Sequence, residues 1–281
     1  MPELPEVETV VRSLRGVLTG RHIQAWQIFW PRSLDDPELP ATLQQQADNR
    51  ITGLTRRAKW ILVLFANGSR IGIHLRMTGR LYPVSMQEWP TLDKHLISWA
   101  WQLDESEWLV FADQRRFGRT IWLPDENSYN AFNARFGPEP LGRKFTTASL
   151  FRALQGSRRQ IKPWLLDQTR IAGLGNIYVD ESLWLAQIHP QTATNLVPPK
   201  QAQLLRDSIR KVLRRAIAAN GTTFMNFKFL SGSEGGYTDE LLVFRRQGQP
   251  CPRCQGLIER IQVAQRSTHF CPQCQPWLVR S

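Results

Sequence analysis

Apolar residues recur at helical spacing near the start of the chain. Val7, Val10 and Leu14 fall on one face of a helix, and Pro5 suits its first turn. Gly20 suits the left-handed backbone that often ends a helix. The pattern predicts an amphipathic helix whose apolar face needs a partner.

Between about residues 22 and 124, the pattern changes to short apolar runs that are typical of β-strands. Two of them, 61–65 and 70–74, flank Asn67-Gly68, which is a strong signal for a β-hairpin. Further strands are expected over residues 95–101, 108–111 and 120–123. A β-sandwich or a β-barrel covered by the first helix would bury these faces most simply.

Helical periodicity returns after Gly137-Pro-Glu-Pro140. Helices are expected over residues 148–154, 161–167, 177–186 and 201–219. Residues 221–240 are rich in Gly and Ser and are expected to form a long loop, which is usually functional or mobile. The predicted fold is therefore α+β, with a β-rich N-terminal lobe and a helical C-terminal lobe.

Composition agrees with a folded protein of two domains. Of 281 residues, 42% are hydrophobic and 21% are charged, which excludes disorder of the whole chain. The longest apolar run covers residues 60–66, whereas a membrane helix needs about 20 residues. The first residues are acidic and contain no apolar stretch, so we expect no secretory signal and a soluble, intracellular protein.

The charge of the chain favours a nucleic-acid partner. Lys and Arg number 36 against 24 Asp and Glu, a formal net charge of +12, and 29 of the basic residues are Arg. The guanidinium group binds phosphate in a bidentate way and stacks on bases. A basic surface that confers only solubility is the alternative. A basic intracellular chain of this kind most often binds nucleic acid.

All four cysteines lie close together near the end of the chain. Cys251 and Cys254 form one C-x2-C pair, and Cys271 and Cys274 form a second pair 16 residues later. This spacing is typical of one tetrahedral zinc site, and buried or disulfide-paired cysteines are the alternative. Four thiolates leave no open position for a substrate, so the predicted zinc ion is structural and stabilises a short hairpin.

Pro2 and Glu3 carry the first candidate chemistry. Removal of Met1 would leave Pro2 as a secondary amine, and an α-amino group titrates near pH ~8, so a useful fraction is neutral at neutral pH. Such an amine can attack a sugar C1′ atom and form an iminium, or Schiff base. Glu3 is placed beside it to move protons. Capping of the first helix is the alternative role for this segment.

Several short strings follow one another along the chain. They are Pro2-Glu-Leu-Pro-Glu-Val-Glu-Thr9, Arg56-Arg-Ala-Lys59, His74-Leu-Arg-Met-Thr-Gly79, Asp113-Gln-Arg-Arg-Phe-Gly118, Gly137-Pro-Glu-Pro-Leu141, Ile161-Lys-Pro-Trp-Leu-Leu-Asp167, Gly173-Leu-Gly-Asn-Ile-Tyr178, Gly221-Thr-Thr223 and the cysteine hairpin with Ala264-Gln-Arg266. In this order, over essentially the whole chain, they resemble the bacterial formamidopyrimidine-DNA glycosylases.

The resemblance implies catalytic roles for the matching residues. Pro2 would be the nucleophile that displaces the damaged base at C1′, and Glu3 would protonate the opening deoxyribose. Lys59 would contact phosphate and assist β-elimination. Arg266 would grip phosphate near the lesion and act in δ-elimination. Without the resemblance, Lys59 and Arg266 would be ordinary surface charges.

The resemblance also implies residues that fill the DNA helix when the damaged base is extruded. Phe117 would be a wedge in the base stack, Arg115 would face the orphaned base, and Met77 would occupy the vacancy. On periodicity alone, Met77 and Phe117 would belong to the core.

Four further residues match DNA contacts of the family. His74 and His95 would contact DNA, although a histidine at a strand end is otherwise structural. Asn176, in a tight turn before a helix, would present its amide and nearby backbone N–H groups to phosphate. Arg158 would be a further contact to the DNA backbone.

The implied organisation has three parts. They are a helix-capped β-sandwich catalytic lobe (1–136), a helical DNA-binding lobe with a helix–two-turns–helix element and a lesion-capping loop (137–240), and a zinc-binding β-hairpin (241–281). The implied protein is a bacterial monomer of the cytoplasm or nucleoid, with one structural Zn²⁺ and no membrane partner. It would remove 8-oxoguanine and formamidopyrimidines from damaged double-stranded DNA and then cleave the strand by β,δ-elimination.

Two other functions remain open on the sequence. The sister endonuclease VIII-like branch prefers oxidised pyrimidines, but it more typically begins Pro-Glu-Gly-Pro. A non-enzymatic zinc-hairpin protein that binds damaged DNA would not need Pro2. Leu242-Val-Phe-Arg-Arg246 and Asn226 depart from the usual family strings, which concerns base preference and not strand cleavage.

Overall fold

The computed structural model describes residues 1–45, 48–103, 107–222 and 236–277. It divides into two compact units. The first contains Met1–Ala134, and the second contains Arg135–Thr222 together with the residues from Gly236 onward. No helix in these ranges has the length and apolar character that crossing a bilayer demands.

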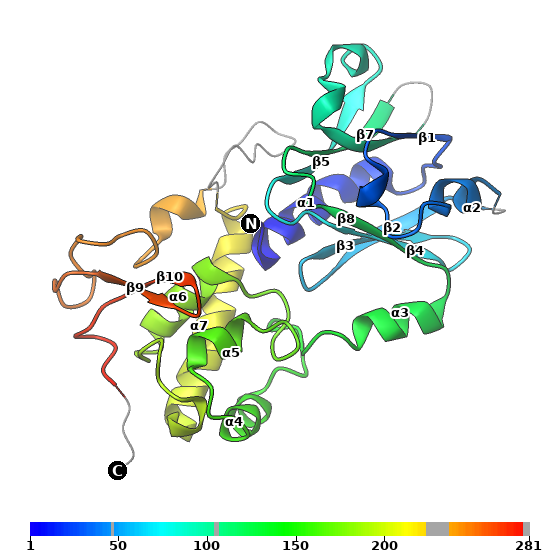
Figure 1. The fold of residues 1–281 in the computed structure, drawn as a ribbon. Coiled ribbons are helices and arrows are strands. Elements are labelled where there is room, and N and C mark those ends of the chain that lie inside the picture. Colours follow the sequence, from blue (N-terminus) through cyan, green and yellow to red (C-terminus); the bar gives the residue numbers. More distant parts are fainter. Residues whose placement is uncertain (46–47, 104–106, 223–235, 278–281) are drawn as a thin grey trace. The chain divides into compact units, whose positions relative to one another are not determined.

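The first unit is a β-sandwich of two antiparallel four-stranded sheets (Figure 1). One sheet has the order β1 (Ala25–Ile28), β6 (Ile97–Gln102), β7 (Glu107–Asp113), β5 (Gly79–Ser85). The other has the order β2 (Ile51–Arg57), β3 (Trp60–Phe65), β4 (Arg70–His74), β8 (Arg119–Leu123). The predicted sandwich is therefore confirmed and the barrel is not formed.

Helix α1 (Leu4–Leu18) packs against β2 and β5, the edge strands of the two sheets. Its apolar face, which includes Val7, Val11 and Leu14, is fully buried in one core with side chains from both sheets. Between the sheets, Trp99 Nε1 on β6 donates a hydrogen bond to Thr120 Oγ1 on β8 at 2.9 Å. The helix thus closes an edge of the sandwich, as the amphipathic pattern requires.

Short helices complete the first unit and correct two expectations. The segment predicted as a strand from residue 95 begins with the 3₁₀-helix η3 (Lys94–Leu96), because the Asp93 carboxylate accepts a hydrogen bond from the His95 N–H at 2.9 Å. A helix that the pattern did not predict, α3 (Glu126–Asn133), begins after Asp125, whose carboxylate accepts a hydrogen bond from the Ser128 N–H at 2.8 Å. The remaining short helices are η1 (Pro31–Ser33), α2 (Leu39–Gln45) and η2 (Trp89–Thr91).

The second unit is helical, with one β-hairpin. Its elements are α4 (Thr147–Gln155), α5 (Ile161–Leu166), α6 (Asn176–Leu185), η4 (Thr194–Leu196), α7 (Pro199–Ala218), η5 (Tyr237–Glu240), β9 (Glu259–Val263) and β10 (Arg266–Phe270). The four predicted helices are confirmed. The end of the predicted loop at 221–240 forms η5, and Asn226 lies outside the described residues.

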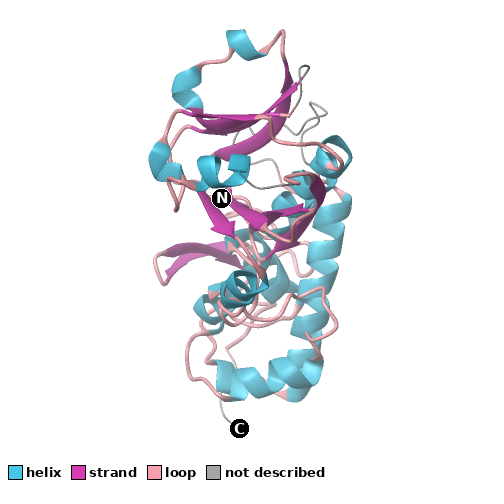
Figure 2. Ribbon diagram, turned by 90° about the vertical axis from the view of Figure 1, so that its right-hand side faces the viewer, coloured by secondary structure: helices cyan, strands magenta, loops and turns pink. Residues whose placement is uncertain are grey.

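Helix α6 is the centre of this unit. All its residues from Ile177 to Trp184 are buried, because α7 packs on one side and the β9–β10 hairpin on another (Figures 1 and 2). A helix covered on several sides has few positions for solvated charges. Its two carboxylates, Asp180 and Glu181, are buried as well, so each needs partners inside the protein.

Candidate functional site

The first candidate group lies at the start of α1. Met1 is 41% exposed, whereas Pro2 is buried and Glu3 is only 3% exposed. Glu3 is the N-cap residue of α1, and its N–H donates to Glu6 Oε2 at 2.8 Å. The helix start is thereby fixed, and both residues lie at the positive end of the helix dipole.

Lys59 lies in the tight turn between β2 and β3. The turn requires a left-handed backbone at Ala58, with φ of 52°, and Lys59 is 5% exposed, so it is not a solvated surface lysine. Arg56 donates from Nη1 to the Ala58 carbonyl oxygen at 2.8 Å and from Nε to Glu8 Oε2 on α1 at 3.1 Å. Arg56 therefore fixes the turn that carries Lys59 against the first turns of α1.

His74 ends strand β4 beside this turn. Its Nδ1 accepts a hydrogen bond from the Arg76 N–H at 2.9 Å, and its ring meets the Trp60 ring edge-on at 4.9 Å. Burial, with the nearby positive charges of Arg76 and Lys59, lowers the pKa of His74 to about 3. The imidazole is therefore neutral at physiological pH, and with Nδ1 as the acceptor its proton is on Nε2.

Two loops of the first unit are joined by the buried carboxylate of Asp113. Asp113 Oδ1 accepts from the Thr78 hydroxyl at 2.5 Å, and Oδ2 accepts from the Gly118 N–H at 2.6 Å. The Arg115 N–H in turn donates to Thr78 Oγ1 at 3.1 Å. The loop with Met77 is thus held beside the loop with Arg115 and Phe117, although the two are 35 residues apart in sequence.

Glycine is required where these loops join their strands. A Cβ atom at Gly79 would lie 2.4 Å from the Leu75 carbonyl oxygen, and one at Gly118 would lie 2.4 Å from the Phe111 ring. Arg76 in the first loop and Arg116 in the second have a left-handed backbone, with φ of 54° and 56°, which turns each loop. The glycines of the Thr-Gly79 and Phe-Gly118 strings are therefore needed for close backbone approach.

His95 is connected to the same loop cluster. Arg116 Nη2 donates to the His95 carbonyl oxygen at 3.2 Å, and the Arg115 guanidinium lies 4.8 Å from the centre of the Phe117 ring. Phe117 is 49% exposed, so it does not belong to the core. Met77 is half-buried. The structure thus brings together four of the predicted DNA contacts, namely Met77, His95, Arg115 and Phe117.

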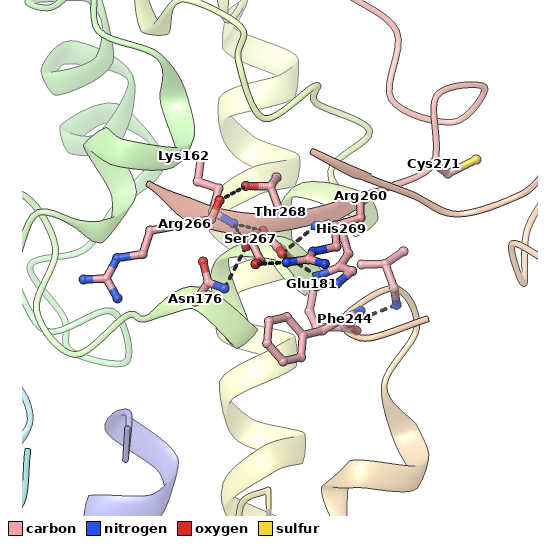
Figure 3. A network of polar contacts seen from close by, with 12 residues as sticks. Lys162, Asn176, Glu181, Phe244, Arg260, Arg266, Ser267, Thr268, His269 and Cys271 are labelled. Carbon is pink, nitrogen blue, oxygen red and sulfur yellow. Dashed lines mark hydrogen bonds and ion pairs between the residues drawn. The ribbon is translucent and has the colours of Figure 1, made fainter. Parts of the chain in front are cut away.

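In the second unit, Asn176 and Arg266 lie next to each other (Figure 3). Asn176 begins α6 and donates from Nδ2 to the Ser267 carbonyl oxygen at 2.8 Å. Arg266 is the neighbouring residue on β10, and its exposed guanidinium points away from the polar network (Figure 3). The side-chain amide of Asn176, which was predicted to contact phosphate, thus also holds the strand that carries Arg266.

A buried ion pair fastens the same strand. Lys162 Nζ on α5 lies 2.6 Å from Asp180 Oδ1 on α6, and both side chains have no solvent exposure. Lys162 Nζ also donates to the Ser267 carbonyl oxygen at 2.9 Å, and Asp180 Oδ2 accepts from the His269 N–H at 2.9 Å. The two helices and β10 are therefore joined through one ion pair (Figure 3).

Glu181 holds the chain ahead of the cysteine hairpin. Its carboxylate accepts hydrogen bonds from the N–H groups of Leu242, Val243 and Phe244 at 2.8–2.9 Å. Burial raises the pKa of Glu181 above its usual range, while these three donors favour the charged form. The anchoring uses only backbone atoms of 242–244, so the departure of this segment from the usual family string does not disturb it.

The four cysteines form a compact cluster that fits a zinc ion. Their Sγ atoms all lie within 4.8 Å of one another. The Sγ atoms of Cys254 and Cys271 are 3.4 Å apart, and those of Cys251 and Cys274 are 3.8 Å apart. Both distances are far longer than the ~2.05 Å of a disulfide bond. They are close to the ~3.8 Å that separates two sulfur ligands, each 2.3 Å from a tetrahedral zinc ion.

The surroundings of Cys251 favour its thiolate, whereas burial and the neighbouring thiols raise the pKa of Cys271 and Cys274. Burial would raise the pKa of Cys251, but backbone N–H donors from Arg253 and Cys254 and the indole of Trp184, 3.4 Å away, lower it to about 6. Bound there, zinc would supply folding energy and no reactive position. The predicted site for one zinc ion is confirmed, and the disulfide alternative is wrong.

Arg158 stands apart from these groups. It is exposed between α4 and α5, in the second unit. Its neighbour Arg159 pairs with Asp167 at 3.0 Å. No contact connects Arg158 to the Asn176–Arg266 group in the described residues, so its assignment still depends on the resemblance alone.

Sequence reasoning missed the residues that support the site. Asp113, Lys162 and Glu181 were given no role, although the first two lie in strings that were singled out. Paired carboxylates at Asp180 and Glu181 in an otherwise apolar helix were a readable signal, because such groups need buried partners. Those partners come from distant segments.

Comparison with known proteins agrees with this arrangement. The model of the formamidopyrimidine-DNA glycosylase N-terminal domain matches residues 1–120, the H2TH domain of that glycosylase matches 136–228, and a zinc finger found in FPG and IleRS matches 248–276. The formamidopyrimidine-DNA glycosylase of Chloroflexus aurantiacus is 46% identical over 277 residues, covering 98% of each chain.

Solved structures with bound DNA are similar over the whole chain. A mutant of the Lactococcus lactis FPG protein with a Fapy-dG containing DNA has a TM-score of 0.90 at 35% identity, covering 98% of this chain and 99% of that one. MutM with carbocyclic 8-oxo-G containing DNA has a TM-score of 0.89 at 36% identity, with the same coverage.

The sandwich, the helical unit and the zinc hairpin, with these matches, define a DNA glycosylase of base excision repair. Its partner is damaged DNA. At 46% identity over nearly its full length, the chain belongs to the formamidopyrimidine-DNA glycosylase family.

Proposed function

We propose that this enzyme removes oxidised purines and then cleaves the abasic strand, with Pro2 as the nucleophile. The observation that carries the proposal is the position of Pro2 at the buried start of α1, beside Glu3. Burial and the positive end of the helix dipole both disfavour a charged amine. Once Met1 is removed, the Pro2 nitrogen is therefore biased toward its neutral, nucleophilic form.

The chemistry follows from this amine. The nitrogen lone pair forms a bond to C1′ while the bond from C1′ to the base breaks. The electron pair of that bond leaves with the base, which takes up the proton that the Pro2 nitrogen gives up. Glu3 donates a proton to the ring oxygen as the deoxyribose opens, giving an iminium. Loss of a proton from C2′ then expels the 3′ phosphate, and a second elimination expels the 5′ phosphate.

The remaining predicted residues hold the DNA for these steps. Lys59 would contact phosphate beside the reacting sugar, and Arg266 would bind phosphate near the lesion. Phe117, Arg115 and Met77 would occupy the space left by the extruded base. Their joint fixation through Asp113 supports this role, because a wedge must be rigid to keep bases apart.

Oxidised purines are the substrates that the comparisons favour. The similar solved structures hold Fapy-dG and 8-oxo-G DNA. A panel of duplexes with oxidised purines or oxidised pyrimidines tests this choice. Excision of pyrimidines alone would place the chain with the endonuclease VIII-like branch in its specificity.

Borohydride trapping tests the nucleophile. The mature enzyme should become covalently joined to lesion DNA, and peptide mass spectrometry should locate the sugar remnant on Pro2. Pro2→Gly should weaken the adduct severely, whereas Arg12→Gln, at an exposed position of the same helix, should leave it unchanged. A remnant on Lys59 would refute the role of Pro2. An absence of both adduct and base release would favour the non-enzymatic alternative.

A further inference from the structure

The outer side of α7 is strongly basic. This helix contains six Lys or Arg residues and one Asp, a formal charge of +5 within a chain of +12. Leu205, Ile209 and Val212 are buried on its inner side. Its outer side forms an open hollow of about 560 Å³, here called the α7 basic surface, which is lined by Arg206, Asp207, Arg210, Lys211, Arg214 and Arg215.

Acidic partners neutralise only part of this surface. Arg206 pairs with Asp207, and Arg215 Nη2 lies 2.7 Å from Glu240 Oε2. These are partly exposed pairs, which bind weakly and exchange readily with other anions. Five cations against two carboxylates leave a formal charge of +3 on the surface.

The other cations of the surface repel one another. Burial and the charges of Arg206 and Arg214 lower the pKa of Arg210, whose guanidinium donates to the Leu141 carbonyl oxygen at 3.2 Å. In the described ranges, no carboxylate pairs with Lys211 or Arg214, and both are exposed. A bound anion would relieve this repulsion.

The α7 basic surface is separate from the group around Arg266. The inner side of α7 packs on α6, and β10, which carries Arg266, packs on another side of α6 (Figures 1 and 2). Packed helices lie roughly 8–10 Å apart between axes, so the full thickness of α6 and α7 separates the two. Phosphates bound at Arg266 would not reach this surface directly.

The chemistry of the surface fits the backbone of duplex DNA. Arg206, Arg210 and Arg214 succeed one another at four-residue intervals, about 6 Å of helix rise each, and arginine suits phosphate oxygens. Single strands are usually held by stacking on aromatic side chains, and α7 contains none. A lipid surface would need an exposed apolar face, but the apolar face of α7 is in the core.

We propose that the α7 basic surface binds the phosphate backbone of a second, undamaged DNA duplex while the lesion site holds the first. The proposal rests on the DNA-binding function of the family and not on the proline chemistry. Two duplexes held at once would let the enzyme pass from one DNA segment to another without full release.

The test counts duplexes bound to the full-length zinc-loaded protein. The protein is saturated with a short duplex that contains a stable abasic-site analogue, and a labelled, lesion-free duplex of ~20 base pairs is then added at low salt. Sedimentation should show one further duplex, with a dissociation constant in the non-specific range of about 10⁻⁶–10⁻⁴ M. The count needs no catalysis, so it stays informative if the proposed chemistry fails.

Variants locate the second duplex. Lys211→Gln with Arg214→Gln should weaken its binding at least fivefold and reduce the slope of log affinity against log salt by about 1.8. The matched control, Arg12→Gln with Arg50→Gln, removes the same charge from exposed positions of the first unit and should bind as the unmodified protein does. Single-turnover cleavage of the short lesion duplex should stay within twofold in both.

Three results would overturn the proposal. The first is a single bound duplex at every concentration of the second. The second is equal binding of the second duplex by the α7 variant and its control. The third is tighter binding of single-stranded RNA, an acidic protein or anionic vesicles than of duplex DNA at this surface.

Discussion

Replacing Lys162 by Met should destabilise the second unit strongly. Methionine fills a similar volume, but it leaves the Asp180 carboxylate, which has no solvent exposure, without its cation. Breaking a buried pair in this way costs about 3–5 kcal/mol. Such a loss is large against the ~5–15 kcal/mol that stabilises a whole domain.

Hydrogen exchange measures this loss in one unit at a time. At 1.36 kcal/mol for each factor of ten, the slowest amides of α6 should exchange about 150- to 5,000-fold faster in Lys162→Met. Amides of β3 in the first unit should keep their rates. Lys200→Met, at an exposed position of α7, is the matched control and should change α6 less than about tenfold.

A double variant separates charge from packing. Lys162→Met with Asp180→Asn removes the unpaired charge but keeps an oxygen that can accept from the His269 N–H. It should regain at least tenfold of the lost protection. If the α6 amides of Lys162→Met exchange as slowly as those of the control, or if the double variant is protected no better than the single variant, the ion pair does not stabilise the attachment of β10.

Three further predictions follow from the site. Because the pKa of His74 is lowered to about 3 in the folded state, the first unit should lose stability as the pH falls from ~6.5 to ~3, by up to about 4 kcal/mol in urea unfolding. His74→Asn should flatten this pH dependence, and an unchanged slope in the variant would contradict the prediction. Zinc chelation should abolish binding at the lesion site before the β-sheet circular dichroism of the first unit changes, because the metal would stabilise the hairpin that carries Arg266. Simultaneous loss of both signals would count against this. Asp113→Asn weakens the contacts to Thr78 and Gly118 and should slow single-turnover base excision about 10–100-fold, with little change in affinity for undamaged duplex; wild-type excision would exclude a positioning role.

Much of the fold could be predicted because its periodic signals are local. The apolar spacing from Val7 to Leu18 predicted α1, and Asn67-Gly68 predicted the β3–β4 hairpin, where Gly68 has φ of 88°. Strand β5 contains Pro83 between Tyr82 and Val84, and because proline disfavours a strand interior, its pattern was not distinct. The choice between sandwich and barrel depends on which strands pair across the lobe, and that information is not local.

The candidate site divides in the same way. Cysteine spacing predicted the zinc ligands, since the ligands are close in sequence. The supporting contacts could not be predicted, because Thr78 is 35 residues from Asp113 and Lys162 is 105 residues from Ser267. The roles of Pro2 and the other site residues came from the resemblance and await the trapping and cleavage experiments.

The packing of α1 against both edge strands has a consequence for synthesis. The second of these strands, β5, ends at Ser85, 67 residues after the end of α1 at Leu18. At ~5–20 residues per second, a ribosome needs roughly 3–13 s to make that stretch. Strand β2 is made earlier, but until β5 follows, the helix lacks one of the two edge strands that cover its valines and leucines, so nascent chains should be clients of chaperones that bind apolar segments.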